Sequence, residues 1–213
     1  MDWKKAFEEV RAFWLHDGHP ERPYALLTSG KISNFFFNGS KVIERPSLVE
    51  QIADQWTLEF WRRATGEENY PDVVVGPAAG AVTLAYELAR AFPGAHSWFT
   101  EEDAGAKKLK RFAPDPNITK ALVVEDVITT GESAQETVDA VLAAGLEVYP
   151  FILCVINRSG KKTLPDGKEI VALIEERGAV SWERGHNPFT PGGGELVEPV
   201  RAKPNWGALT KSY

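Results

Sequence analysis

Hydrophobic residues along the chain follow two alternating patterns, which predict strands and helices in turn. Apolar runs typical of buried strands occupy residues 72–76, 97–100, 121–124, 147–156 and 169–175. Apolar residues spaced three or four positions apart predict helices over residues 46–65, 81–92 and 134–144. Because strands alternate with helices, the pattern predicts an α/β fold with a mainly parallel sheet flanked by helices.

The first forty residues have a different pattern. Apolar residues at helical spacing predict a helix over residues 2–15: Trp3, Phe7, Val10 and Trp14. A turn at Ser29-Gly30, followed by an aromatic run over residues 32–37, predicts a β-hairpin. The three consecutive phenylalanines of this run place at least one ring on the less buried face, where a ring could stack on a flat heterocycle.

Composition narrows the possible classes of protein. The chain has 213 residues, of which 43% are hydrophobic, enough for one large domain or two small ones. No apolar run reaches the length of about 18 residues that a membrane span needs, and the charged N-terminus is unlike a signal peptide. The single cysteine, Cys154, suits a reducing cytoplasm. A net charge of −6 argues against a broad nucleic-acid-binding surface.

The most informative stretch is residues 121–133, with the sequence ALVVEDVITTGES. Its apolar start predicts a buried strand, and the acids Glu125 and Asp126 follow at the carboxyl end. Residues 129–133 then lead into a helix, whose first N–H groups and dipole favour an anion such as phosphate. Because the lysine of a nucleotide-binding P-loop is missing, the stretch indicates a sugar phosphate, with the two carboxylates accepting hydrogen bonds from the sugar hydroxyls.

Two other strand ends carry residues suited to a ligand. Residues 76–81 form a loop of small side chains, which lets a ligand approach the backbone closely. Arg158 follows the strand over residues 147–156, and a guanidinium can bind a carboxylate through two parallel hydrogen bonds; a surface arginine in a turn is the alternative. Ligands of open α/β sheets bind at the carboxyl ends of strands, so these positions are candidates for one site.

Residues 101–119 lack any apolar period. A loop of this length in a compact domain is usually functional or disordered. It carries a local cluster of positive charge in a chain that is acidic overall: Lys107, Lys108, Lys110 and Arg111. We expect a mobile lid that folds over an anionic substrate and excludes water, with a solvated run of charges as the alternative.

Over its whole length, the stretch 121–133 resembles the phosphoribosyl-pyrophosphate (PRPP) motif of the type I phosphoribosyltransferases: an apolar strand, two acids, an apolar pair and Thr-Thr-Gly-x-Ser. Residues 29–37 are similar to the segment that forms a hood over the base in orotate phosphoribosyltransferases. The resemblance extends from about Leu26 to Pro199. It implies the type I phosphoribosyltransferase fold, with a single domain over residues 1–213. The core would cover about 46–180, and a small hood over the carboxyl ends of the strands would come from about 20–45 and the C-terminal tail.

The resemblance also implies an activity. The reaction would transfer the 5-phosphoribosyl group of PRPP to orotate, giving orotidine 5′-monophosphate and pyrophosphate in pyrimidine nucleotide biosynthesis. Mg²⁺ would bind through PRPP, with no metal ligand assigned to the protein. The resemblance further implies a homodimer. From composition we expect a cytoplasmic protein with neither nucleic acid nor a membrane as a partner.

Individual residues take their expected roles from the same resemblance. The expected PRPP-binding residues are Ala78, Ala79, Gly80, Glu125, Asp126, Val127, Ile128, Thr129, Thr130, Gly131, Glu132 and Ser133. The expected orotate-binding residues are Thr129, Arg158, Phe36 and Phe37. The expected catalytic residues are Glu125 and Asp126, with Lys107 or Lys108 in the place of a lid lysine. In related enzymes, the loop at 76–81 often contains a non-proline cis peptide bond.

Three positions depart from the family pattern. Thr28 stands where many members have a cation, Glu102 where a base is usual, and Asn157 where the family has aspartate. The lid lysine is therefore not assigned by motif. Two alternatives stay open: a phosphoribosyltransferase for another base, and a sensor that binds PRPP without turnover.

Overall fold

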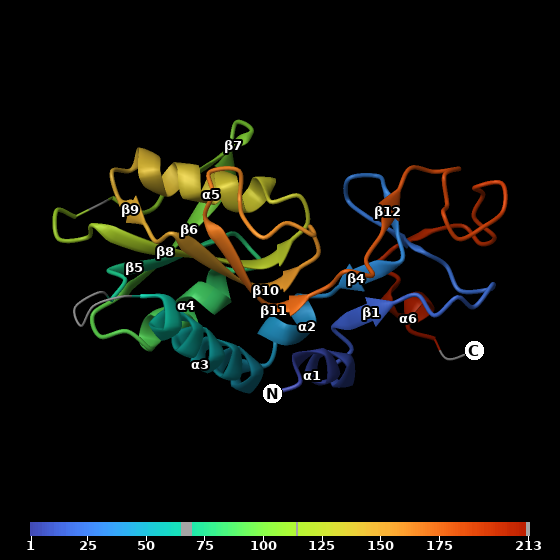
Figure 1. The fold of residues 1–213 in the computed structure, drawn as a ribbon, viewed down its shortest axis with the longest axis horizontal. Coiled ribbons are helices and arrows are strands. Elements are labelled where there is room, and N and C mark those ends of the chain that lie inside the picture. The colour runs from blue at the N-terminus through green and yellow to red at the C-terminus, as the bar shows by residue number, and fades with distance from the viewer. Residues whose placement is uncertain (65–69, 114, 212–213) are drawn as a thin grey trace. The chain divides into compact units, whose positions relative to one another are not determined.

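The computed structural model describes residues 1–64, 70–113 and 115–211, and the chain divides into two compact units (Figure 1). The core unit comprises residues Val42–Glu175. The terminal unit joins the two ends of the chain, Met1–Lys41 and Glu176–Tyr213. The short helix α2 (Ser40–Ile43) lies where the chain passes from the first of these segments into the core unit.

A seven-stranded sheet forms the centre of the core unit, with the strand order β11-β10-β8-β5-β6-β7 and β9 beside the start of β8. Its strands are β5 (Val73–Pro77), β6 (His96–Asp103), β7 (Ala106–Lys108), β8 (Lys120–Ile128), β9 (Glu147–Val148), β10 (Phe151–Asn157) and β11 (Glu169–Glu175). All neighbours pair in parallel except β6 and β7. The predicted α/β fold with a mainly parallel sheet is confirmed.

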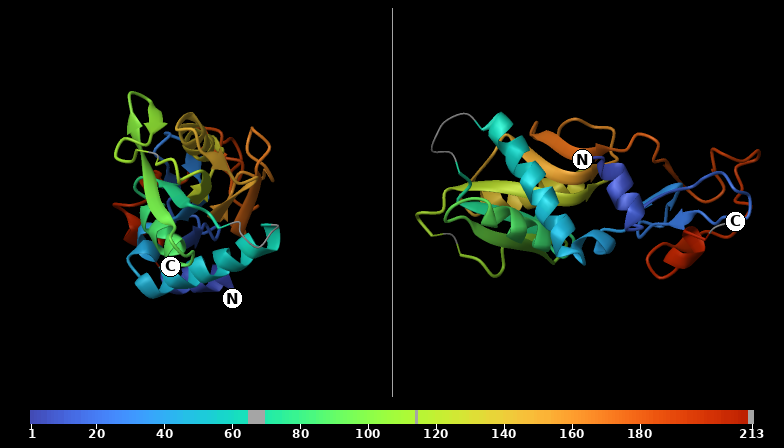
Figure 2. Two further views of the ribbon diagram at one scale, coloured as in Figure 1. Left: turned by 90° about the vertical axis from the view of Figure 1, so that its left-hand side faces the viewer. Right: turned by 90° about the horizontal axis from the view of Figure 1, so that it is seen from below.

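Helices cover both faces of this sheet, as the two orthogonal views show (Figures 1 and 2). The helix α5 (Glu132–Ala143) lies on one face, and α3 (Pro46–Arg63) and α4 (Val82–Arg90) lie on the other. Because both faces are covered, the central strands are buried on both sides, which explains their continuous apolar runs. The predicted helix over residues 46–65 is confirmed as far as Arg63, and residue 65 lies outside the described residues.

The core beneath α5 fixes the helix on the strand that precedes it. Val138 and Val141 of α5 are fully buried against alternate residues of the strands, including Val123 of β8 and Ile152 of β10. The turn between β8 and α5 is therefore held at both ends by packed apolar side chains. This packing places the small-residue stretch at 129–133 at the carboxyl edge of the sheet.

The expectation of an irregular segment over residues 101–119 is wrong for residues 101–108. β6 continues to Asp103, and β7 pairs with it in antiparallel register around a turn at Ala104 and Gly105, which have φ of 51° and 82°. Oppositely charged side chains hold this hairpin, with Lys108 Nζ 2.9 Å from Asp103. Because the hairpin is built from exposed charged residues, it gives no apolar period in the sequence.

The terminal unit contains two small sheets and two short helices. Its elements are α1 (Trp3–Glu9), β1 (Phe13–Leu15), β2 (Ala25–Leu26), β3 (Ile32–Ser33), β4 (Phe35–Phe37), β12 (Ser181–Trp182), β13 (Val200–Arg201) and α6 (Trp206–Leu209). One sheet has the order β12-β3-β2-β13, and the other pairs β1 with β4. Segments from both ends of the chain therefore build one sheet.

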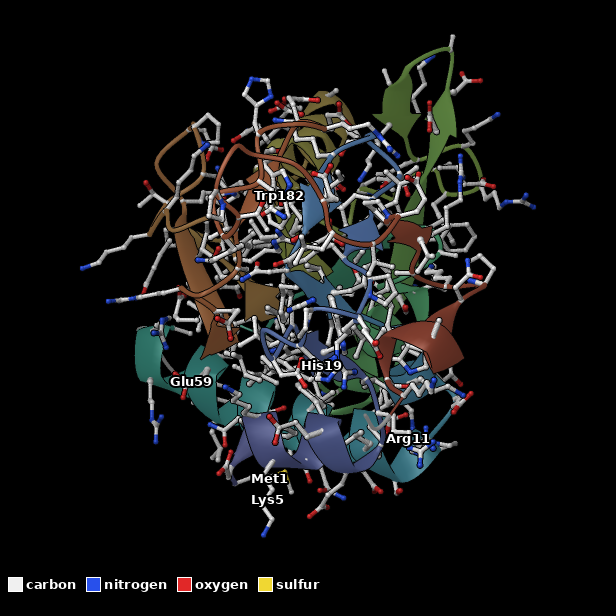
Figure 3. All side chains as sticks on the ribbon, turned by 90° about the vertical axis from the view of Figure 1, so that its right-hand side faces the viewer. Met1, Lys5, Arg11, His19, Glu59 and Trp182 are labelled. Atoms are coloured by element: carbon white, nitrogen blue, oxygen red, sulfur yellow. The ribbon has the colours of Figure 1, made fainter. Side chains whose placement is uncertain are left out.

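The predicted helix over residues 2–15 is wrong beyond Glu9. Arg11, labelled in Figure 3, has a φ of 55°, which ends the helical path, and residues 13–15 pair with Phe35–Phe37 instead. The indole N–H of Trp14 donates to the carbonyl of Leu209 at 2.9 Å. The segment therefore gains a strand partner and a tertiary hydrogen bond that local spacing does not reveal.

The predicted hairpin is confirmed for β2 and β3, with the turn at Gly30 in a left-handed conformation. The predicted strand over residues 32–37, however, is interrupted at Asn34. The Asn34 side chain accepts from the N–H of Val180 at 2.7 Å and donates to the carbonyl of Gly178 at 3.0 Å. Beyond this residue β4 pairs with β1, and of its three rings only Phe36 is half-buried rather than buried, as the sequence predicts for at least one of them.

Candidate active site

The carboxyl ends of three parallel strands bring the predicted core-unit residues to one edge of the sheet. β5 ends in the small-residue loop, β8 carries the acid pair, and β10 ends before Arg158. Register places Cys154 of β10 opposite Glu125, and Val75 of β5 opposite Val123. Open α/β sheets bind ligands at this edge, so the arrangement forms a candidate site.

Glu125 is the buried member of the acid pair, with 3% of its surface exposed. Its Oε2 accepts a hydrogen bond from the hydroxyl of Ser133 at 3.0 Å, and its Oε1 accepts from the backbone N–H of Asp126 at 3.1 Å. Burial, reinforced by the neighbouring Asp126 carboxylate, raises the pKa of Glu125 to about 8. Burial therefore favours the protonated form of Glu125 in the ligand-free protein.

Asp126 is half-buried and lies against the small-residue loop that follows β5. Its Oδ1 accepts from the N–H of Val127 at 2.8 Å. A Cβ atom added to Gly80 would lie 2.7 Å from the Cγ of Asp126, so only glycine permits this approach. The peptide bond between Ala78 and Ala79 is cis, as the family resemblance suggests. The structure thus brings the acid pair close to the loop at 76–81, which carries the expected PRPP-binding residues Ala78, Ala79 and Gly80.

The residues 129–133, which we call the phosphate cup, form the turn between β8 and α5. Gly131 has a φ of 92°, a conformation that favours glycine. The Thr130 hydroxyl accepts from the N–H of Glu132 at 3.3 Å, while the N-cap residue of α5 makes no side-chain capping bond. The first N–H groups of a helix have no partner within that helix, so this turn offers donors and a positive dipole end to an anion.

The hairpin separates the two lysines that the sequence could not distinguish. Successive residues of a strand point to opposite faces, so Lys107 and Lys108 diverge. Lys107 Nζ donates to the Ser133 hydroxyl and to the Ser133 carbonyl, the latter at 3.0 Å. Lys108 Nζ instead pairs with Asp103 at 2.9 Å. Of the two candidates, only Lys107 lies at the phosphate cup.

Sequence reasoning missed the role of the loop after β10. Asn157, noted only as a departure from the family, is 1% exposed, and its Nδ2 donates to the carbonyl of Lys161 at 2.8 Å. Lys161 Nζ in turn donates to the Thr130 carbonyl at 2.9 Å. The place of this loop in the predicted sheet could have indicated its role. Loops that follow adjacent parallel strands, here β8 and β10, emerge at the same edge of a sheet.

The predicted orotate-binding residues come from both units. The backbone N–H of Arg158 donates to the carbonyl of Ile128 at 2.9 Å, which ties this loop to the end of β8. Thr129 is exposed at the start of the phosphate cup. Phe36 and Phe37 belong to the terminal unit, where Phe36 packs against Trp206 with ring centroids 5.8 Å apart. Their part in orotate binding stays a prediction.

The acid pair is suited to a magnesium ion that arrives with a phosphorylated substrate. Mg²⁺ in enzymes is commonly held by one or two carboxylates together with substrate phosphates and water. The half-buried carboxyl group of Asp126 would suit such an ion as an oxygen ligand. Within residues 1–64, 70–113 and 115–211, no cluster of three or more His, Cys, Asp or Glu side chains is placed to hold a metal ion. In the same residues, no helix is long and apolar enough to cross a membrane.

Comparison with known proteins identifies a family over most of the chain. Residues 49–191 match the model of the phosphoribosyl transferase domain. The orotate phosphoribosyltransferase of Caldicellulosiruptor bescii is 41% identical over 156 residues, which cover 73% of this chain and 74% of that protein. The enzyme of the same name from Thermoanaerobacter sp. is 34% identical and covers 92% of this chain and 98% of its own length. The crystal structure of orotate phosphoribosyltransferase from Aeropyrum pernix superposes with a TM-score of 0.60 at 18% identity, covering 79% of this chain and 90% of that one.

Proposed function

The chain belongs to the orotate phosphoribosyltransferase family of the type I phosphoribosyltransferases, and we propose how its site carries out that family's reaction. The reaction transfers the 5-phosphoribosyl group of PRPP to orotate and yields orotidine 5′-monophosphate and pyrophosphate. The observation that supports this most directly is the hydrogen bond between Glu125 and Ser133 at 3.0 Å. It joins the acid pair to the phosphate cup, so that one ribose phosphate can contact both.

The phosphate cup binds the 5′-phosphate of PRPP. The N–H groups at the start of α5, which have no partner within that helix, and the hydroxyls of Thr129 and Thr130 supply donors for phosphate oxygens. The dipole of α5 adds a favourable field at the same end. These groups fix one end of the substrate, which reduces the entropy lost when the two reactants align.

The acid pair holds the ribose. Breaking the bond between C1 of the ribose and pyrophosphate builds positive charge on the sugar ring, which the Asp126 carboxylate stabilises. Burial favours the protonated form of Glu125, and in that form its carboxyl group can donate as well as accept a hydrogen bond at the ribose hydroxyls. The pair therefore positions the sugar and favours the charge that develops on it.

The departing pyrophosphate meets the loop at 76–81. Its small side chains leave the backbone of Ala78, Ala79 and Gly80 accessible to phosphate oxygens. Asp126 would help to hold a Mg²⁺ ion that arrives with PRPP, and such an ion would supply positive charge near the leaving group. Lys107 provides a further cation beside the phosphate cup.

Lys107 and Lys108 form a matched pair of variants. We expect Lys107→Met to lower kcat/KM for PRPP about tenfold, because one charge-assisted hydrogen bond at a substrate phosphate is worth roughly 1.5 kcal/mol or more. Lys108→Met is expected to leave it within about twofold, because its exposed ion pair with Asp103 contributes little. Steady-state kinetics at varied PRPP concentration measure kcat/KM for both variants. Equal losses in the two variants would refute the assignment of Lys107.

Arg158 selects the base by binding the carboxylate of orotate, and Thr129 supplies a further contact to the base. We expect Arg158→Ala to raise the KM for orotate about tenfold or more and to leave the KM for PRPP unchanged, because a guanidinium–carboxylate pair is lost. Separate titrations of the two substrates measure the difference. A similar rise in both KM values would exclude the carboxylate role.

A panel of bases tests the function itself. Purified protein, PRPP and Mg²⁺ are incubated with orotate, uracil, adenine or hypoxanthine, and pyrophosphate release is followed. We expect release with orotate alone. Release with another base would favour a different phosphoribosyltransferase, a reading kept open by Thr28, Glu102 and Asn157. Binding of PRPP without release for any base would favour a sensor. We also propose a homodimer, which light scattering of the purified protein would test, and a cytoplasmic location, which fractionation of cells would test.

A further inference from the structure

The loop after β10 is connected to the phosphate cup by a series of hydrogen bonds. Asn157 Nδ2 lies 3.2 Å from each carboxylate oxygen of Glu175 and 2.8 Å from the carbonyl of Lys161. Asn157 Oδ1 accepts from the N–H of Ser159 at 3.0 Å and from its hydroxyl at 2.6 Å. One buried side chain thus fixes the loop from residue 157 to residue 161.

Asparagine at position 157 is required by these contacts. A carboxylate there would face Glu175 and could not donate to the carbonyl of Lys161. The departure from the family's aspartate therefore has a structural reason, since the amide holds Lys161 in place. Ser159 also helps to hold Lys161 in place, because its hydroxyl accepts a hydrogen bond from the N–H of Lys161 at 3.0 Å.

Lys161 connects the fixed loop to the phosphate cup through a hydrogen bond. Its Nζ lies 2.9 Å from the carbonyl oxygen of Thr130. The carbonyl of Thr130 and the N–H of Gly131 belong to one planar trans peptide and point in opposite directions. A cation that holds the carbonyl on one side of the turn therefore directs the N–H of Gly131 to the other side.

We propose that Lys161 is a positioning residue that orients the peptide between Thr130 and Gly131 for the 5′-phosphate. The inference rests on the proposed function, in which the cup binds that phosphate. Lys161 acts through the loop backbone, and its ammonium group also adds positive charge near the cup. Neither the motif nor the family resemblance assigns this lysine a role.

Binding measurements with ribose 5-phosphate and with magnesium pyrophosphate test the proposal by isothermal titration calorimetry. We expect Lys161→Met to weaken ribose 5-phosphate about tenfold, the loss of one charge-assisted hydrogen bond, and to leave pyrophosphate unchanged. Lys161→Arg, which keeps a charged donor, is expected to restore binding to within about threefold. Lys162→Met, the neighbouring exposed lysine, is the matched control and is expected to bind both probes like the wild type.

The outcomes separate this proposal from the proposed function. Wild-type protein that fails to bind ribose 5-phosphate would contradict the phosphate cup itself. Wild-type binding together with equal binding by Lys161→Met would overturn the role of Lys161 and leave the cup intact. Equal weakening of both probes in Lys161→Met would also overturn it, because a positioning effect on the peptide of Gly131 is confined to the 5′-phosphate.

Discussion

Replacing Asp126 with asparagine is expected to lower kcat about 10²- to 10³-fold, the range seen when one preorganised electrostatic contact to a transition state is removed. Asparagine has nearly the same shape and keeps the Oδ1 acceptor for the N–H of Val127. The change removes the negative charge that favours the cationic sugar ring and that would help to hold Mg²⁺. Steady-state kinetics with saturating PRPP and orotate measure the loss.

A matched control separates chemistry from folding. Asp139 is exposed on α5, and Asp139→Asn makes the same chemical change away from the candidate site. We expect it to keep turnover within about twofold and both variants to keep their melting temperatures within a few degrees, because neither change opens a cavity. Turnover near the wild-type value in Asp126→Asn would remove Asp126 from the mechanism.

Gly80→Ala is expected to lower kcat/KM for PRPP about 10²-fold, a loss typical of a displacement near 1 Å in a catalytic group. The added Cβ would meet the Asp126 carboxyl group, with Cγ only 2.7 Å away, so the loop or the acid has to move. Both neighbours belong to the proposed PRPP site, so a shift of either one is expected to displace a group that would contact PRPP. Kinetics with PRPP varied measure the effect.

Gly207→Ala is the control for this change, since a Cβ at that position meets nothing within 4 Å. We expect Gly207→Ala to match the wild type in turnover and stability. A Gly80→Ala protein with full activity would mean that PRPP does not depend on the contact between the loop and the acid pair.

The sequence was most informative where local pattern and tertiary structure agree. From β8 to α5, a buried strand, a small-residue turn and an amphipathic helix follow each other directly, so the chain order alone placed the acid pair beside the phosphate cup. The helix over residues 2–15 was overextended for the opposite reason. The strand partner of residues 13–15 is Phe35–Phe37, which is remote in sequence and leaves no trace in local spacing.

The roles of the lysines could not be predicted, because they depend on geometry across elements. Lys107 and Lys108 are equivalent in composition, and only the hairpin turn at Ala104 and Gly105 decides which one faces Ser133. The contact of Lys161 with Thr130 joins two loops 31 residues apart in sequence. Long-range hydrogen bonds of this kind leave no periodic pattern in the sequence. The PRPP motif, which ends at residue 133, therefore gave no indication of Lys161.

The most direct test of the account is a crystal structure of the protein with bound ribose 5-phosphate. We predict that the phosphate lies in the cup at residues 129–133, on the N–H groups at the start of α5, and that the ribose hydroxyls face Glu125 and Asp126. Binding of ribose 5-phosphate elsewhere on the protein would contradict the account. So would a cup that contains the side chain of Lys107 and no phosphate at saturating ligand.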